Sequence, residues 1–367
     1  MKKLLSGILI AVLVFSLAAC GDKKDDGGAK DAKLKVGFIF IGSINDGGYT
    51  QAQYDGMKAT EKYFKGDVET LYLENVSDTD KQASLDAARN LIDQGCNVIV
   101  GCSYGYMDSL EELANKDEYK DVNFLHFSGN KMNDTNFGNF FGAMEEARYL
   151  TGMIAGSMTK TNKIGYVAAH PYTEVIIGIN AFTLGVQEVN KDAVVKVVYI
   201  NSWGDPELEK TAAEQLLAAG CDVLTQHSDS TAPQLAAQEK GAYAIGYNYD
   251  NPVAEKAYLT SAIWHHETFL KETFKAMIDG TWKPESYYGN IKDGYIGIGK
   301  MTKLVPSDVQ DKVNAKLKEM ESGEFAPFSG KIEFADGGIL CDDGKTLTRA
   351  EIWELNTKLI KGAEGTK

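Results

Sequence analysis

The chain contains one segment twice, and this internal repeat limits the possible folds more than any other feature. Residues Ala87–Ser103 read AARNLIDQGCNVIVGCS, and residues Ala212–Ser228 read AAEQLLAAGCDVLTQHS. Each copy has apolar residues at helical spacing, then a glycine where a helix C-cap belongs, then a short apolar strand. Each copy therefore predicts a helix followed by a buried strand.

The repeat extends beyond this segment. Residues 35–39 match residues 163–167, and residues 68–73 match residues 195–200, at nearly the same offset. Self-similarity of this kind indicates a repeated structural unit. We therefore predict two α/β lobes, each a strand–helix–strand–helix–strand unit with a parallel sheet. Open parallel sheets bind ligands at the carboxyl ends of their strands, so the residues after those strands are the first candidates for a site.

Composition excludes several classes of function. The formal net charge of -14 argues against binding to nucleic acid, whose phosphates require a basic surface. The five cysteines show no disulfide or metal-binding spacing, and Cys96 and Cys221 are expected in the core. The loop after the first strand is not a dinucleotide-binding G-x-G-x-x-G. Residues 294–302 come close to a phosphate-binding loop, but Met301 stands where a hydroxyl must bind Mg²⁺. We expect no cofactor and no metal.

The first 33 residues indicate export. Residues 1–20 have a basic start, an apolar stretch and the sequence Leu17-Ala-Ala-Cys20, which together are typical of a secretory signal peptide. Leu-Ala-Ala-Cys followed by glycine resembles a bacterial lipobox, which implies cleavage before Cys20 and lipidation of its thiol. The alternative is an ordinary signal peptide with a chance cysteine. Residues 21–33 are polar and predict a flexible tether. We expect a protein held by lipid on the extracytoplasmic face of the cell membrane.

Candidate ligand-binding residues share one property: almost all lie at or just after a predicted strand. The aromatic ones offer flat rings for stacking, and the polar ones offer hydrogen bonds. They are Asp46, Tyr49, Tyr54, Ser103, Tyr104, Asn130, Trp203, His227, Asp229, Asn248, Asp250 and Trp264. Planar rings with mixed donors and acceptors suit a small, flat, polar ligand, although sugars also bind to aromatics and carboxylates.

Three of these candidates keep a second explanation. Asp46 can cap the helix that follows it rather than bind a ligand. Trp203 can cover the edge of its lobe. His227 can hydrogen-bond a ligand, act as a general base oriented by a carboxylate, or be structural; with no nucleophile or metal set nearby, we favour hydrogen bonding. The pair His265-His266 is adjacent in sequence and points in different directions on a helix, so we expect a solvated helix start there and no metal site.

Four motifs together resemble the basic membrane protein (BMP) family of substrate-binding lipoproteins of ABC importers. These are the lipobox at Cys20, the loop at 42–56 with Asp46-Gly-Gly-Tyr49-Thr, the segment 145–156 (EEARYLTGMIAG), and Leu259-Thr-Ser261. The similarity runs from about residue 35 to the last helix. The resemblance implies a type I periplasmic-binding-protein fold, with two Rossmann-like lobes joined by a three-crossing hinge. It also implies closure around a purine nucleoside, with Asp46 and Tyr49 in ligand-binding positions.

Two positions depart from the family pattern. Family members that bind nucleosides commonly have Asp where this chain has Asn248 and Lys where it has Trp264, and both are implied to contact ribose. We therefore expect a purine base such as adenine first and a nucleoside second, delivered to an ABC permease by a monomeric binding protein. The alternatives are an exported nucleoside-processing enzyme and a ligand sensor.

The expected lobes follow from the repeat and the resemblance. We place the N-terminal lobe at 34–145 plus about 264–285. The C-terminal lobe takes 146–263 plus about 286–345, with the second part containing edge or antiparallel strands. Residues 346–367 are expected to form a terminal helix and tail.

Overall fold

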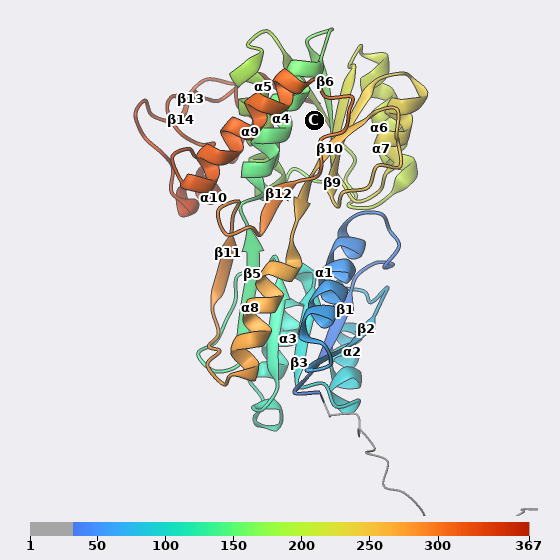
Figure 1. The fold of residues 1–367 in the computed structure, drawn as a ribbon, viewed down its shortest axis with the longest axis vertical. Helices are drawn as coiled ribbons and strands as arrows, with labels where there is room; N and C mark the ends of the chain where they lie inside the picture. Colours follow the sequence, from blue (N-terminus) through green and yellow to red (C-terminus); the bar gives the residue numbers. More distant parts are fainter. Residues whose placement is uncertain (1–31, 367) are drawn as a thin grey trace, which may run out of the picture. The chain divides into compact units, whose positions relative to one another are not determined.

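The computed structural model describes residues 32–366, so the expected signal peptide, Cys20 and most of the tether lie outside the described residues. The described chain builds two α/β lobes, each around its own sheet (Figure 1). The first sheet has the strand order β11-β5-β4-β3-β1-β2 and the second β12-β10-β9-β8-β6-β7-β15. The type I periplasmic-binding-protein fold is confirmed, with sheets that are parallel except where β12 pairs antiparallel with β10.

The first lobe is built mainly from the N-terminal third of the chain. Its elements are β1 (Leu34–Phe40), α1 (Tyr49–Phe64), β2 (Val68–Leu73), α2 (Lys81–Asp93), β3 (Val98–Cys102), α3 (Met107–Ala114), β4 (Asn123–Phe127), β5 (Phe137–Gly142), α8 (His266–Ile278) and β11 (Ser286–Gly289).

The second lobe repeats that architecture and adds the C-terminal segments. Its elements are α4 (Met144–Met158), β6 (Lys163–Ala168), α5 (Thr173–Val189), β7 (Val194–Tyr199), α6 (Pro206–Ala218), β8 (Val223–His227), α7 (Ala232–Glu239), β9 (Tyr243–Asn248), β10 (Tyr258–Trp264), β12 (Ile296–Ile298), α9 (Ser307–Ser322), β13 (Ile332–Glu333), β14 (Ile339–Cys341), α10 (Arg349–Leu355) and β15 (Ala363–Thr366).

The sequence repeat corresponds to equivalent elements in the two lobes. Its copies form α2 with β3 and α6 with β8, and both central strands pair in parallel with the first strand of their lobe. Gly95 and Gly220 follow the two helices with φ of 91° and 87°. That left-handed conformation is the one that glycine adopts without steric cost, so the predicted C-caps are confirmed.

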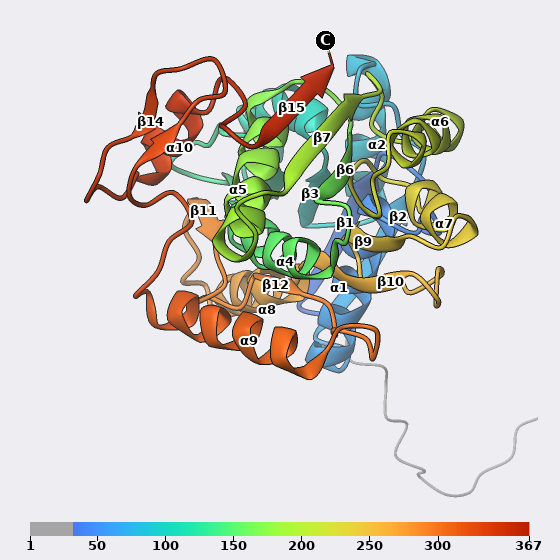
Figure 2. The ribbon, with the colours of Figure 1, turned by 90° about the horizontal axis from the view of Figure 1, so that it is seen from above.

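The chain crosses between the lobes three times: from β5 to α4, from β10 to α8, and from β11 to β12. Three details differ from the expected boundaries. Trp264 ends β10 of the second sheet, so the first lobe resumes after it and not at it. Residues 286–289 form β11 and pair in parallel with β5, so they belong to the first lobe. Residues 346–367 contain the expected terminal helix, α10, and the tail after it adds Ala363–Thr366 as a parallel edge strand beside β7, as Figure 2 shows.

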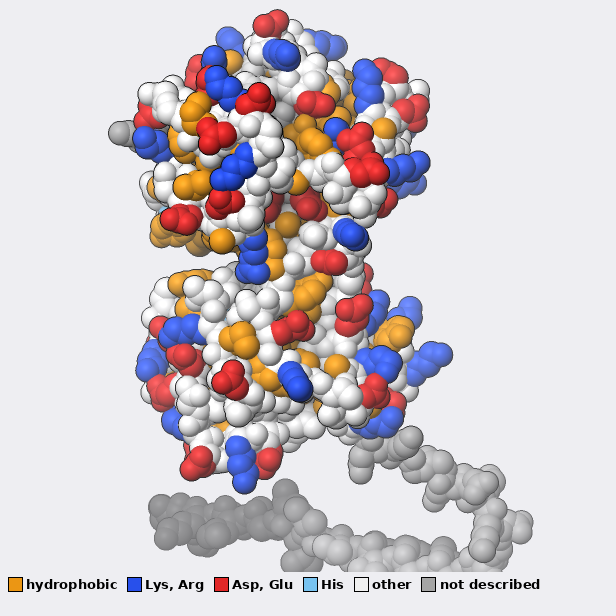
Figure 3. Space-filling model, turned by 90° about the vertical axis from the view of Figure 1, so that its left-hand side faces the viewer, with side chains coloured by type: hydrophobic (Ala, Val, Ile, Leu, Met, Phe, Trp, Pro, Cys, Tyr) orange, Lys and Arg blue, Asp and Glu red, His pale blue; other side chains and the backbone are white. Residues whose placement is uncertain are grey.

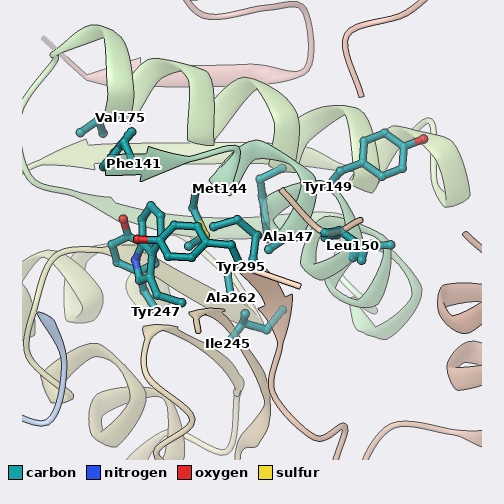
Figure 4. Close-up of a cluster of buried hydrophobic side chains, with 14 of the residues drawn as sticks. Phe141, Met144, Ala147, Tyr149, Leu150, Val175, Ile245, Tyr247, Ala262 and Tyr295 are labelled. Carbon is teal, nitrogen blue, oxygen red and sulfur yellow. The ribbon is translucent and has the colours of Figure 1, made fainter. Parts of the chain in front are cut away.

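The core of the second lobe forms around α4, which is buried along almost its whole length. Small residues on this helix explain how closely it packs on α5: a Cβ on Gly152 would lie 2.1 Å from the carbonyl oxygen of Phe182. On its other side, Met144 and Ala147 face Tyr247, Ala262 and Tyr295 (Figure 4). This packing fixes the hinge end of α4 next to the strands that carry the candidate site. Among the described residues, no helix has the length and apolar character needed to cross a membrane.

Candidate functional site

The candidate site lies where the carboxyl ends of strands from both lobes approach each other. The first lobe brings the end of β4 and the loop before α1, and the second brings the ends of β8, β9 and β10. Figure 3 shows hydrophobic side chains at the narrow junction between lobes whose surfaces are otherwise mixed in charge. The site is therefore built where an open parallel sheet is expected to bind a ligand.

A chain of hydrogen bonds connects three strand ends of the second lobe. The indole Nε1 of Trp264 donates to Oδ1 of Asn248 at 3.0 Å, and Nδ2 of Asn248 donates to Oδ1 of Asp229 at 3.0 Å. Burial is the main cause that raises the pKa of Asp229 well above its usual range, and the carboxylates of Asp46 and Glu209 add to it. These three residues, all predicted from the sequence, hold one another in fixed orientations.

Aromatic rings from both lobes form a cluster around Trp264. The ring of Phe127 lies 5.2 Å from Trp264 at a steep angle, and Tyr49 lies 5.8 Å from Phe127. His266 is stacked on the Trp264 indole at 5.7 Å and is buried, so the expected solvated helix start is wrong at this residue. Burial lowers the pKa of His266 to about 3, which keeps the ring neutral. The cluster offers apolar surface for a flat ligand.

His227 lies at the end of β8 and is 1% exposed. Its ring lies 4.5 Å from that of Tyr247, and the guanidinium of Arg148 lies over the Tyr247 ring at 3.9 Å from its centroid. Burial lowers the pKa of His227 to about 4. A neutral imidazole is suited to hydrogen bonding.

The carboxylate of Asp46 is hydrogen-bonded to backbone amides of its own loop and of α1. It accepts hydrogen bonds from the amides of Gly48, Thr50 and Gln51 at 2.8–3.0 Å. The capping explanation for Asp46 therefore holds, because these are the unpaired amides of the first turn of α1. The cap shapes the loop that meets the second lobe, where a Cβ on Gly48 would lie 2.1 Å from the carbonyl oxygen of Asp229.

Trp203 lies at the rim of the site and is 38% exposed. Its ring is 5.5 Å from His170, 6.2 Å from Tyr172 and 6.3 Å from His227. Its carbonyl accepts a hydrogen bond from the amide of Asp229 at 2.8 Å. Trp203 is thus both a support for the Asp229 loop and an exposed ring beside the site.

The remaining five candidates make contacts within their own lobes. Tyr54 packs its ring on Tyr72, Ser103 donates to a carboxylate oxygen of Asp78, Tyr104 is exposed, the Asn130 backbone amide contacts Met107, and Asp250 accepts from Tyr258. The structure does not bring these five into the cluster around Trp264. Ser103 and its repeat partner Ser228 both bond a carboxylate from an earlier segment, so this pair of serines holds loops together.

Sequence reasoning missed four residues near the site: Phe127, Glu174, Tyr247 and Tyr288. Phe127 and Tyr247 lie at or near strand ends like the predicted residues, but they are apolar or aromatic residues within core strands and carry no separate signal in the sequence. Glu174 lies in the first turn of α5, where an acidic residue is ordinarily explained by the helix dipole. Tyr288 belongs to β11, beyond the repeat, and nothing in the repeat points to it.

A small cavity adjoins the cluster, bounded by the hinge and by α5. Its volume is about 10 Å³, close to the space of one water molecule, so a larger ligand requires movement of side chains or lobes. Within residues 32–366, no group of three or more His, Cys, Asp or Glu side chains is placed to hold a metal ion.

Comparison with known proteins identifies the family. The family described as ABC transporter substrate-binding protein, PnrA-like (Bmp) matches residues 33–326. A purine-binding protein of Brucella abortus (strain 2308) is 37% identical over 85% of this chain and 88% of its own length. A candidate ABC transporter glucose-binding protein of Haloferax volcanii is 32% identical over 83% of this chain and 77% of its own.

A solved structure shows the same fold. An ABC transporter solute-binding protein from Conexibacter woesei DSM 14684 superposes with a TM-score of 0.68 at 20% identity, covering 80% of this chain and 98% of its own. The family match and the relatives make this a binding protein and not an enzyme. The chain belongs to the PnrA-like family of ABC transporter substrate-binding proteins.

Proposed function

We propose that this chain is a lipid-anchored, extracytoplasmic protein that binds a purine between its lobes and delivers it to an ABC permease. A purine base such as adenine is the preferred ligand, and a nucleoside is second. The chain acts as a monomer whose lobes close by bending at the three crossings.

One observation supports a purine as the ligand. Hydrogen bonds join Trp264, Asn248 and Asp229 in a row beside the rings of Phe127 and Tyr49. Flat aromatic surface supports a planar base, and stacking a base on an aromatic side chain contributes about 1–3 kcal/mol. The partly exposed carboxyl group of Asp229 at its edge supports recognition of amino and ring N–H groups. The similarity to a purine-binding protein over most of the chain supports the same class.

The preference for a base over a nucleoside rests on how closed the site is. Asn248 is fully buried and its amide already holds Trp264 and Asp229, so burial, rather than exhausted hydrogen-bonding capacity, keeps it from a ribose hydroxyl.

Mass spectrometry tests the ligand class directly. The protein is expressed in rich medium, purified without denaturation, and then denatured so that bound small molecules are released. A purine base is the expected compound. Release of a sugar would favour the second candidate function, hexose binding, which the similarity to the candidate glucose-binding protein of Haloferax volcanii supports.

Fractionation of cells tests the lipid anchor. The full chain is expected in the membrane fraction, and Cys20→Ala is expected to leave the protein outside that fraction or uncleaved. A wild-type protein recovered without lipid on its N-terminus would contradict the anchor.

Transport and sensing are separated by growth. Deletion of the gene is expected to abolish growth on a purine as the sole nitrogen source if the protein delivers cargo. Normal purine uptake in the deletion strain would support the sensor alternative.

A further inference from the structure

The cavity beside the aromatic cluster contains a polar group without a partner. The cavity is bounded by Phe141 and Glu145 near the hinge, by Glu174 and His227 of the second lobe, and by Tyr288 and Trp353. The Nε2 atom of His227 is buried and has no hydrogen-bond partner among the described residues. It lies 3.7 Å from Oε1 of Glu174, which is too long for a hydrogen bond.

The surroundings of His227 favour one tautomer. The other ring nitrogen, Nδ1, lies 3.5 Å from the hydroxyl of Tyr166, which can donate or accept. Glu174 as a carboxylate can only accept. The proton is therefore best placed on Nε2, facing Glu174, while Nδ1 accepts from Tyr166.

The ring also stays neutral. Burial is the main cause that lowers the pKa of His227 to about 4, and the buried guanidinium of Arg148 acts in the same direction. Arg148 is held behind the strand end by donating to the carbonyl oxygen of Gln226 at 2.8 Å. The cavity wall thus presents one neutral N–H donor beside one carboxylate acceptor, with a gap between them.

We propose that His227 and Glu174 together read one edge of the bound heterocycle. The Nε2–H of His227 donates to a ring nitrogen of the ligand, and Glu174 accepts from the exocyclic amino group beside that nitrogen. The pair selects planar nitrogen heterocycles that carry an acceptor beside a donor. This inference rests on the proposed purine binding and adds to it a residue, Glu174, that decides between ligands.

The physical basis of the selection is an acceptor left without a donor in a closed site. The side chain of Glu174 is 31% exposed, and a ligand without the amino group covers its carboxylate without offering a donor. Sites built to bond a particular group discriminate strongly against analogues that lack it, because the protein group is then left unpaired.

Isothermal titration with two ligands and three proteins tests the pair. The ligands are adenine and unsubstituted purine, which lacks the amino group. The wild type is expected to bind adenine on the order of tenfold or more tighter than purine, as the loss of a hydrogen bond to a charged group predicts. Glu174→Gln is expected to lose most of that preference by weakening adenine binding while purine binding changes less than about threefold. Glu188→Gln, an exposed position on the same helix, is expected to behave as wild type.

A second variant tests the histidine. His227→Leu is expected to weaken both ligands, because both carry the ring nitrogen that accepts from Nε2–H, and His227→Gln is expected to recover part of the loss by restoring a donor. Thermal melting of each variant checks that it is folded.

The outcomes separate the two proposals. If the wild type binds neither adenine nor purine, purine binding and the present inference both fail. If the wild type binds adenine and Glu174→Gln keeps the wild-type preference, or weakens both ligands equally, only the role of Glu174 is overturned.

Discussion

Asn248 shows how one residue can organise a site. It ends β9 with φ of 66°, a left-handed conformation that asparagine tolerates better than most residues. Its amide is oriented by two partners, because the indole N–H of Trp264 must meet an oxygen and the carboxyl of Asp229 must meet an N–H. The orientation of three side chains is thereby fixed before any ligand arrives.

Trp264→Phe is expected to lower the free energy of unfolding by about 1–3 kcal/mol, because it leaves the buried Oδ1 of Asn248 without a donor. The phenyl ring keeps part of the packing on Phe127 and His266. Chemical denaturation measures the change. Trp203→Phe is the matched control: its ring is at the rim, so its free energy of unfolding should stay within about 0.5 kcal/mol of wild type. Equal effects of both substitutions would show that the hydrogen bond of Trp264 is unimportant.

The residues that the sequence predicted correctly as neighbours are those for which strand ends and polarity coincide. His227, Asn248 and Trp264 end strands of the second sheet, Asp229 follows one of them, and the four meet as parallel topology requires. Ser103 follows the equivalent strand of the first copy, but its hydroxyl donates a hydrogen bond to the carboxylate of Asp78 and is not directed to the site. Neighbouring loops form hydrogen bonds with some strand-end groups and not with others. That difference depends on three-dimensional contacts that one sequence does not reveal.

The first turn of α4 connects two of the three crossings. Glu145 lies next to the hydroxyl of Tyr288, and Oε2 of Glu146 accepts a hydrogen bond from the amide of Ile291 at 2.8 Å. Burial raises the pKa of Glu145 to about 8, with a further contribution from Glu146, whereas Arg349 acts in the opposite direction. Burial likewise raises the pKa of Glu146 to about 7. These carboxyls tie the start of α4 to the segment that contains β11 and β12.

The raised pKa of Glu145 predicts how stability depends on pH. The folded state holds a proton that the unfolded state releases near pH 4.5, so the stabilisation is complete below that pH and is lost as pH rises to about 8. Each unit of pKa difference corresponds to about 1.4 kcal/mol. The free energy of unfolding should therefore fall more steeply from pH 5 to pH 8 in the wild type than in Glu145→Gln.

Urea denaturation at several pH values measures both slopes. Glu214→Gln, which changes an exposed carboxylate on α6, serves as the control and should keep the wild-type slope. Parallel curves for wild type and Glu145→Gln would show that Glu145 titrates in the folded protein as it does in water.

The elements outside the repeat were the hardest to predict. The repeat predicts six strands, three in each copy, and their parallel pairing, because equivalent segments fold alike. The edge strands β11, β12 and β15 have no counterpart in the repeat. Their apolar stretches are also short. Their places depend on which sheet edge is open when the chain returns, and β15 takes the edge beside β7.

The two lobes touch at one side of the site. The side-chain Nδ2 of Asn251 donates to the backbone carbonyl oxygen of Gly47 at 3.4 Å. Gly48 lies against the backbone of Asp229. Glycine suits this position because it has no Cβ to meet the carbonyl oxygen of Asp229. The described conformation is a closed one.

Gly48→Ala is expected to hold the lobes apart, because its Cβ would lie 2.1 Å from the carbonyl oxygen of Asp229. Small-angle X-ray scattering should give a larger radius of gyration than wild type, and ligand affinity should fall. Gly204→Ala is the matched control, since its Cβ would meet Asp229 at an ordinary 3.7 Å. An unchanged radius and affinity for Gly48→Ala would mean that closure does not use this contact.

Isothermal titration of the wild-type protein tests the central claim, purine binding by the closed lobes, most directly. Adenine and glucose are titrated separately into protein that has been unfolded, dialysed and refolded to remove bound molecules. One adenine is expected to bind per chain, with no heat of binding from glucose. Binding of glucose without binding of adenine would contradict the account.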